Sequence, residues 1–173
     1  MLLEAVLLQL LVLATRASPV IFEDCGSAYD LFIVNIEGCG AAVPCYVTLG
    51  EQIPVNVMFY ADFMSRQLDQ DVTININYIH ARTPVTPEPC ETVILCPVQS
   101  DAITSFTSVM SVPTDMALNQ RGYLQWRVYN EAGRQVLCYS VLVQTQNYLQ
   151  KMMRQYVSEV HRKRLHQMGF YGL

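Results

Sequence analysis

Six cysteines are the residues of this chain whose type and spacing carry the clearest chemistry: Cys25, Cys39, Cys45, Cys90, Cys96 and Cys138. An even set of cysteines within β-type sequence indicates disulfides formed in an oxidising compartment. A zinc site would instead use short C-x-x-C spacings with nearby histidines, and the sequence contains neither. We therefore expect oxidised cysteines and no bound metal.

Six cysteines can pair in many ways, and the sequence separation between them favours one set of pairs. Two pairs each bracket a short loop, whose ends can meet within a normal disulfide Cα separation. The remaining two cysteines would then join the start of the domain to its last strand, a link worth about 4–5 kcal/mol if chain entropy governs. The predicted pairs are Cys39–Cys45, Cys90–Cys96 and Cys25–Cys138.

Other residues with catalytic potential form no recognised pattern. The sequence has no G-x-S-x-G, no H-E-x-x-H and no phosphate-binding glycine loop, and its three histidines are His80, His161 and His166. Asp69 and Asp71 are typical of a solvated turn rather than of a calcium site. We predict no catalytic residues, no cofactor and no enzymatic activity.

An apolar run at residues 2–14 is followed by Thr15-Arg16-Ala17. The run is short for a membrane span, and small residues stand where a signal peptidase cuts, so residues 1–17 are predicted to be a signal peptide. The alternative, an apolar first helix of a cytosolic protein, disagrees with the even cysteine count. No N-x-S/T sequon occurs, which favours an extracellular destination over the endosomal or lysosomal lumen. We expect a soluble, secreted monomer.

Charge is distributed unevenly along the chain. Residues 18–143 contain thirteen Asp or Glu against five Arg and no Lys, whereas residues 144–173 contain five Lys or Arg and one Glu. The acidic body has no basic stripe with interleaved aromatic residues, so nucleic-acid binding is excluded as a function class.

The elements that would position these residues are strands. Apolar and polar residues alternate in Val72–Tyr78 and again around Trp126, so these strands would show one face to a core and one to water. The segment 130–134 is predicted to be a hairpin turn, with Gly133 able to take a positive φ. This pattern predicts an all-β antiparallel sandwich. The predicted strands are 29–36, 55–63, 72–79, 103–112, 123–129 and 135–145.

Several strings resemble the ML lipid-recognition domain family over roughly residues 20–146. They are Phe22-Glu23-Asp24-Cys25-Gly26-Ser27, Pro87-Glu88-Pro89-Cys90, Cys96-Pro97-Val98-Gln99-Ser100-Asp101, and Trp126 twelve residues before Cys138. The resemblance implies an immunoglobulin-like sandwich of two sheets with an apolar cavity between them, which holds a sterol or another apolar lipid. It also implies the three disulfides named above, and a domain at residues 18–146.

The resemblance further implies where the lipid would lie. Phe106 and Trp126 occupy positions that lie beside the lipid pocket in the family, and Val85 with its flanking prolines occupies the position of a loop at the pocket mouth. Phe106 stands where the family's sterol binders usually have Tyr, which removes a hydroxyl. From the alternation of the strands, the candidate ligand contacts also include Phe59, Ile76, Val128 and Val141.

Residues 147–173 depart from the family and are predicted to form a basic amphipathic tail. Apolar residues at i, i+3, i+4 spacing form one stripe, and the helix is expected to stop near Gly169. The stripe consists of Tyr148, Leu149, Met152, Met153, Tyr156, Val157 and Val160. One alternative is that it packs on the sandwich or belongs to a partly disordered extension. The other is that stripe and cations contact an anionic membrane surface, an acidic partner or a lipid-accepting membrane protein. The candidate contact cations are Lys151, Arg154, Arg162, Lys163 and Arg164.

Three functions remain open at this point. The first is a secreted carrier that binds and transfers sterol, and the second is an immune or semiochemical lipid sensor for fatty acids or glycolipids. The third is a sandwich with a filled core that acts through its surface as a protein-interaction module. The absence of Lys from residues 18–143 disfavours a pocket for phosphorylated glycolipids.

Overall fold

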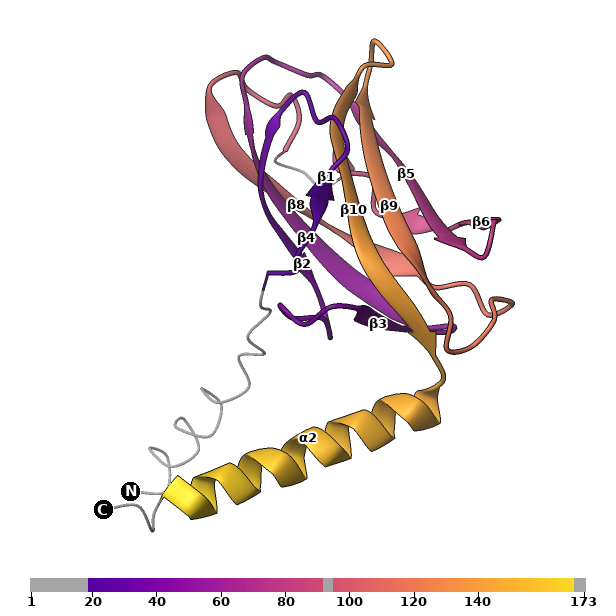
Figure 1. Cartoon of the computed structure of the whole chain (residues 1–173). Helices are drawn as coiled ribbons and strands as arrows, with labels where there is room; N and C mark the ends of the chain where they lie inside the picture. The colour runs from indigo at the N-terminus through magenta and orange to yellow at the C-terminus, as the bar shows by residue number, and fades with distance from the viewer. Residues whose placement is uncertain (1–18, 92–94, 170–173) are drawn as a thin grey trace, which may run out of the picture.

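A computed structural model describes residues 19–91 and 95–169, with side chains of the C-terminal helix up to Arg164. In these ranges two β-sheets pack face to face, and one long helix follows them (Figure 1). The predicted fold class, a two-sheet sandwich with a C-terminal helix, is confirmed. The predicted signal peptide, residues 1–17, lies outside the described residues.

The first sheet has the order β1-β10-β9-β5-β6, and β3 also pairs with β10. All its pairings are antiparallel except that of β3 with β10, which is parallel and begins at Cys45 opposite Val143. Its strands are β1 (Glu23–Asp24), β3 (Cys45–Thr48), β5 (Leu68–Ile76), β6 (Ile79–Arg82), β9 (Arg121–Asn130) and β10 (Gln135–Gln146).

The second sheet has the order β2-β4-β8-β7 and is antiparallel throughout. Its strands are β2 (Asp30–Ile36), β4 (Gln52–Ala61), β7 (Val85–Thr86) and β8 (Ala102–Ser111). In β4 every second residue from Ile53 to Ala61 is buried and the intervening side chains are partly exposed. This period of two is what places one face of each strand in a shared core.

Aromatic side chains from both sheets lie in that core. Trp126 of β9 stacks on Tyr139 of β10 with ring centroids 6.0 Å apart, and Phe59 of β4 meets Phe106 of β8 edge to face at 6.2 Å. All four are buried. The core is therefore built from residues that are distant in sequence and that only the pairing of the strands brings together.

The sequence prediction located the six long strands and missed four short ones, β1, β3, β6 and β7. The expected strand 72–79 was wrong at its end, because Asn77 and Tyr78 take positive φ values of 49° and 66° and turn the chain from β5 into β6. Short edge strands carry too few residues for an alternation to be visible. The predicted turn at 130–134 is confirmed, with Gly133 at φ 70° and its N–H donating to Asn130 O at 2.8 Å.

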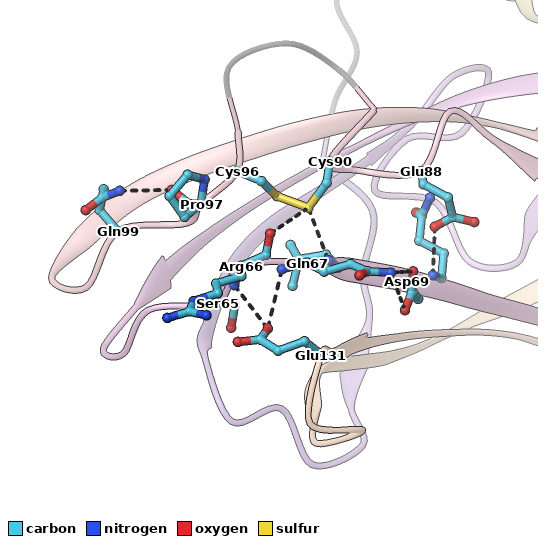
Figure 2. Close-up of a disulfide and its surroundings, with 12 residues drawn as sticks. Ser65, Arg66, Gln67, Asp69, Glu88, Cys90, Cys96, Pro97, Gln99 and Glu131 are labelled. Atoms are coloured by element: carbon cyan, nitrogen blue, oxygen red, sulfur yellow. Dashed lines mark hydrogen bonds between the residues drawn. A yellow bond between two sulfur atoms is a disulfide. The ribbon is translucent and has the colours of Figure 1, made fainter.

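The three disulfides are those predicted from the sequence spacing of the cysteines. Their Cα separations are 5.0, 5.2 and 5.2 Å for Cys25–Cys138, Cys39–Cys45 and Cys90–Cys96. Figure 2 shows the third beside the residues that lead into β5. There Leu68 N–H donates to Cys90 Sγ at 3.1 Å, and Arg66 N–H donates to Glu131 Oε2 at 3.0 Å. This disulfide therefore anchors the loop between β7 and β8 against the start of β5.

Helix α2 (Tyr148–Gly169) begins with a reciprocal cap. Gln150 N–H donates to Asn147 Oδ1 at 2.8 Å, and Asn147 N–H donates to Gln150 Oε1 at 2.9 Å. Such a box satisfies backbone donors that a helix start otherwise leaves unpaired. The predicted helix is confirmed, and the chain is helical as far as the last described residue, Gly169.

No helix in residues 19–91 and 95–169 combines the length and the apolar character that a membrane crossing requires.

Candidate functional site

A pocket of about 470 Å³ is lined by residues of β5 in one sheet, of β7 in the other sheet and of the segment that joins β6 to β7. Its wall is the segment that crosses from β6 to β7. Thr83 N–H donates to Val72 O at 2.8 Å, which ties this segment to β5, and Ser111 N–H donates to Pro84 O at 2.9 Å, which ties it to β8. The lining residues are Gln70, Val72, Arg82, Thr83, Pro84, Val85 and Glu88.

Gln70 links the two sheets at this pocket. Its side-chain Nε2 donates to Ser108 Oγ of the opposite sheet and to Pro87 O, each at 3.1 Å. Its Oε1 accepts the indole N–H of Trp126 at 3.1 Å. Ser108, which is fully buried, donates in turn to Pro87 O at 2.8 Å. The network orients Trp126, because a buried indole N–H requires an acceptor.

Charged groups at the pocket are held by partners of their own. Glu88 Oε2 accepts Gln70 N–H at 2.9 Å, and burial raises the pKa of the Glu88 carboxyl above its usual value. Arg82 is the one cation among the described lining residues, and its guanidinium pairs with Asp71 at 2.7 Å. Apart from Arg82 and Glu88, the described lining residues are uncharged, and they include no unpaired cation to meet a phosphate.

Among the residues that the structure describes, Thr83 has no hydrogen-bond partner for its hydroxyl, although the residue is 97% buried. Leaving a buried hydroxyl unpaired destabilises a fold by about 1–3 kcal/mol. Thr83 is also one of the residues that line the pocket.

Tyr139 has a second buried hydroxyl without a partner in the described part of the chain. Burial raises the pKa of Tyr139 well above its usual value, because the phenolate would be unsolvated there. The ring stacks on Trp126. Thr83 on the pocket wall and Tyr139 in the aromatic core thus each carry a buried hydroxyl without a partner among the described residues.

The predicted ligand-contact residues all belong to the hydrophobic core of the sandwich or pack against it. Val85 is half-buried and lines the pocket, whereas Phe59, Phe106 and Trp126 are buried in the core and do not line it. Val128 is paired with Gln70, while Ile76 lies at the far end of β5 and Val141 lies on β10. All seven belong to or pack against the same cluster, and their contact with a ligand stays a prediction.

Sequence reasoning missed Gln70, Ser108, Thr83 and Tyr139. A signal for two of them was present, since Gln70 continues the inward series of Val72 and Ile74, and Ser108 stands between inward Phe106 and Met110. The sequence contains no signal for Thr83, because the position of this residue depends on where the chain crosses from one sheet to the other.

Two of the predicted contact cations of the tail are used inside the molecule. Lys151 forms an ion pair with Glu51, and the Arg154 guanidinium lies 3.4 Å from the centre of the Tyr46 ring. Arg162 pairs with Glu159 at 3.9 Å. Lys163 and Arg164 are exposed.

The profile of the ML domain family matches residues 19–145, which include both sheets and the pocket. This chain belongs to the ML domain family. The matched residues end just before α2, which begins at Tyr148.

Curated relatives and solved structures agree with this assignment. The chain is 28% identical over 142 residues to NPC intracellular cholesterol transporter 2 of Mus musculus, covering 80% of this chain and 93% of the relative. It is 26% identical over 145 residues to the Sus scrofa protein of the same name, covering 83% and 96%. A Niemann-Pick type C2 protein from Japanese carpenter ant has the same fold, with a TM-score of 0.64 and 18% identity over 73% of this chain and 99% of that one.

Membership in this family confirms two predictions at a coarse level. The chain is a lipid-binding protein, and it is not an enzyme.

Proposed function

We propose that this ML-family protein is a carrier for a sterol-type lipid, which enters between β5 and β7 and occupies the space between the sheets. The observation that carries the proposal is the buried, unpartnered Thr83 hydroxyl on the wall of the pocket. A ligand with one neutral hydroxyl and a rigid apolar body matches this arrangement. Its hydroxyl would bond Thr83, and its body would lie toward Phe106 and Trp126.

Energetics support a largely apolar ligand. Each 100 Å² of apolar surface removed from water contributes about 2.5 kcal/mol. The pocket volume of about 470 Å³ lies within the range of small-molecule sites. The aromatic side chains of the core are buried without a ligand, so binding would require the two sheets to part around the guest.

Charge favours sterol over the phosphorylated or glycolipid ligands of the alternative sensor function. Arg82 is already paired with Asp71, so a phosphate at the pocket would find no unpaired cation among the described lining residues. The curated relatives of Mus musculus and Sus scrofa are named as cholesterol transporters, which supports the same choice.

The site of action we propose is an oxidising lumen, either extracellular or within endosomes and lysosomes, with the protein acting as a monomer. Three disulfides and no free cysteine suit that environment.

Lipid extraction from protein purified from its own source, followed by mass spectrometry, tests this function. We expect a sterol at one molecule per chain, and a fluorescent sterol such as dehydroergosterol should be displaced by cholesterol and not by oleic acid. Recovery of an acyl lipid alone would support the sensor function, and recovery of no lipid together with no sterol binding would support the surface-acting module. Either result contradicts the proposal.

A further inference from the structure

Helix α2 turns its polar side toward the sandwich and its apolar side away from it. The polar side makes the contacts already described, namely Lys151 with Glu51 and Arg154 with Tyr46, and Gln150 Nε2 donates to Asn119 Oδ1 at 2.8 Å. A groove of about 580 Å³ lies between this side of the helix and the sandwich. The alternative that the apolar stripe packs on the sandwich is therefore wrong.

The apolar stripe is exposed to solvent over its first three turns, with 47–69% of each side chain accessible. An exposed apolar surface of this kind usually marks an interaction site. The exposed residues are Tyr148, Leu149, Met152, Met153, Tyr156 and Val157. Figure 1 shows α2, in yellow, crossing the end of the sandwich at which β3 lies.

Cations continue the stripe along the same face. Lys163 and Arg164 lie seven residues after Tyr156 and Val157, so two helical turns later they point in nearly the same direction. Both are exposed. Glu159, the single acidic residue of α2, is paired with Arg162. The outward face is thus apolar for three turns and basic for the next.

We propose that α2 docks the protein on an anionic lipid bilayer, with its axis in the plane of the membrane. The stripe would enter the boundary between headgroups and acyl chains, where Tyr148 and Tyr156 suit the interface, and Lys163 and Arg164 would meet anionic headgroups. This role rests on the proposed function, because a lipid carrier must meet the membranes with which it exchanges its ligand.

Charge favours a membrane over a second copy of this chain that pairs in parallel through α2. If two α2 helices paired in parallel through their stripes, Lys163 and Arg164 of both copies would lie against each other, which is repulsive. An anionic bilayer matches apolar residues and cations at once.

Co-sedimentation with vesicles of phosphatidylcholine, with and without about one-third phosphatidylserine, tests the docking. Protein expressed with its disulfides intact should bind the anionic vesicles at low salt. The double variant Met153→Gln, Val157→Gln keeps the charge and the helix propensity, and it should reduce binding at least tenfold because two exposed apolar side chains are removed. Lys163→Gln with Arg164→Gln should abolish the preference for phosphatidylserine.

The matched control is Ser158→Gln, on the side of α2 that lines the groove, which should bind like the parent. Circular dichroism and dehydroergosterol binding are measured on every variant. Equal vesicle binding by the stripe variant and the parent overturns the docking, as does a dimer that the stripe variant dissociates in the absence of vesicle binding. If vesicle binding depends on the stripe but no sterol binds, the docking stands and the proposed function fails.

Discussion

At the scale of single residues, the unpaired hydroxyl of Thr83 should have opposite effects on stability and on binding. Thr83→Val removes a buried polar group without a partner, so the free energy of unfolding should rise by about 1 kcal/mol. The same change should weaken dehydroergosterol binding by about three- to tenfold, because the ligand hydroxyl loses its partner. Chemical denaturation and fluorescence titration measure the two effects.

Thr107→Val is the matched control for this prediction. Thr107 lies on the exposed face of β8, where its Oγ1 accepts Asn56 Nδ2 at 3.0 Å. Sterol affinity should be unchanged in the control, and unchanged affinity in Thr83→Val would contradict the proposed role of that hydroxyl.

Tyr139 should make the stability of the fold sensitive to alkaline pH. Its pKa is raised above 10.0 in the folded state by burial, so below pH 10 it is neutral in both states and contributes no pH dependence. Above pH 10 the unfolded chain loses a proton that the folded chain keeps, so unfolding becomes more favourable by about 1.4 kcal/mol per pH unit. Tyr139→Phe should reduce this slope, while Tyr123→Phe, which alters an exposed ring, should not. Equal slopes in denaturation at pH 9–11 would disprove the assignment.

At the scale of elements, the close approach of β5 and β9 depends on Gly122. A Cβ at this position would lie 2.1 Å from Asn75 O, a backbone atom that can move only if the strands separate. Gly122→Ala should therefore destabilise the protein by at least about 2 kcal/mol, measured by chemical denaturation. The pairing of these strands positions Gln70 and Trp126, so sterol affinity should fall as well.

Gly133→Asn is the control for that substitution. Gly133 is in the turn between β9 and β10, no atom lies within 4 Å of its Cβ position, and Asn tolerates its φ of 70°. The control should lose less than about 1 kcal/mol. A Gly122→Ala protein as stable as this control would show that β5 and β9 can adjust.

At the scale of the whole molecule, the ML domain and α2 should be separable. A chain that ends at Asn147 keeps Thr145, whose hydroxyl donates to Ala117 O at 2.6 Å, and so preserves β10 to its end at Gln146. We expect it to bind dehydroergosterol like the parent and to transfer the sterol to anionic vesicles at least tenfold more slowly. A fluorescence transfer assay measures the rate, and equal rates would remove α2 from the transfer mechanism.

Local patterns were sufficient for much of this protein. The long strands follow from alternation, the helix from its stripe and end signal, and the disulfides from the short reach of two loops. The strings around Cys25, Cys90 and Cys96 indicated the ML family. These features depend on residues close together in the chain, whose chemistry can be interpreted without knowledge of the fold.

Two features could be determined only from the tertiary structure: the role of Thr83 and the direction of the apolar stripe of α2. Thr83 becomes a candidate ligand partner only because the chain crosses between sheets there, where Thr83 bonds Val72 of β5 and the next residue, Pro84, bonds Ser111 of β8. The helix stripe was visible in the sequence, but its direction was not, since it depends on Glu51 and Tyr46, about a hundred residues earlier in the chain, which hold the opposite side of α2. Periodicity shows that a face exists, and only contacts between distant residues decide whether that face is buried.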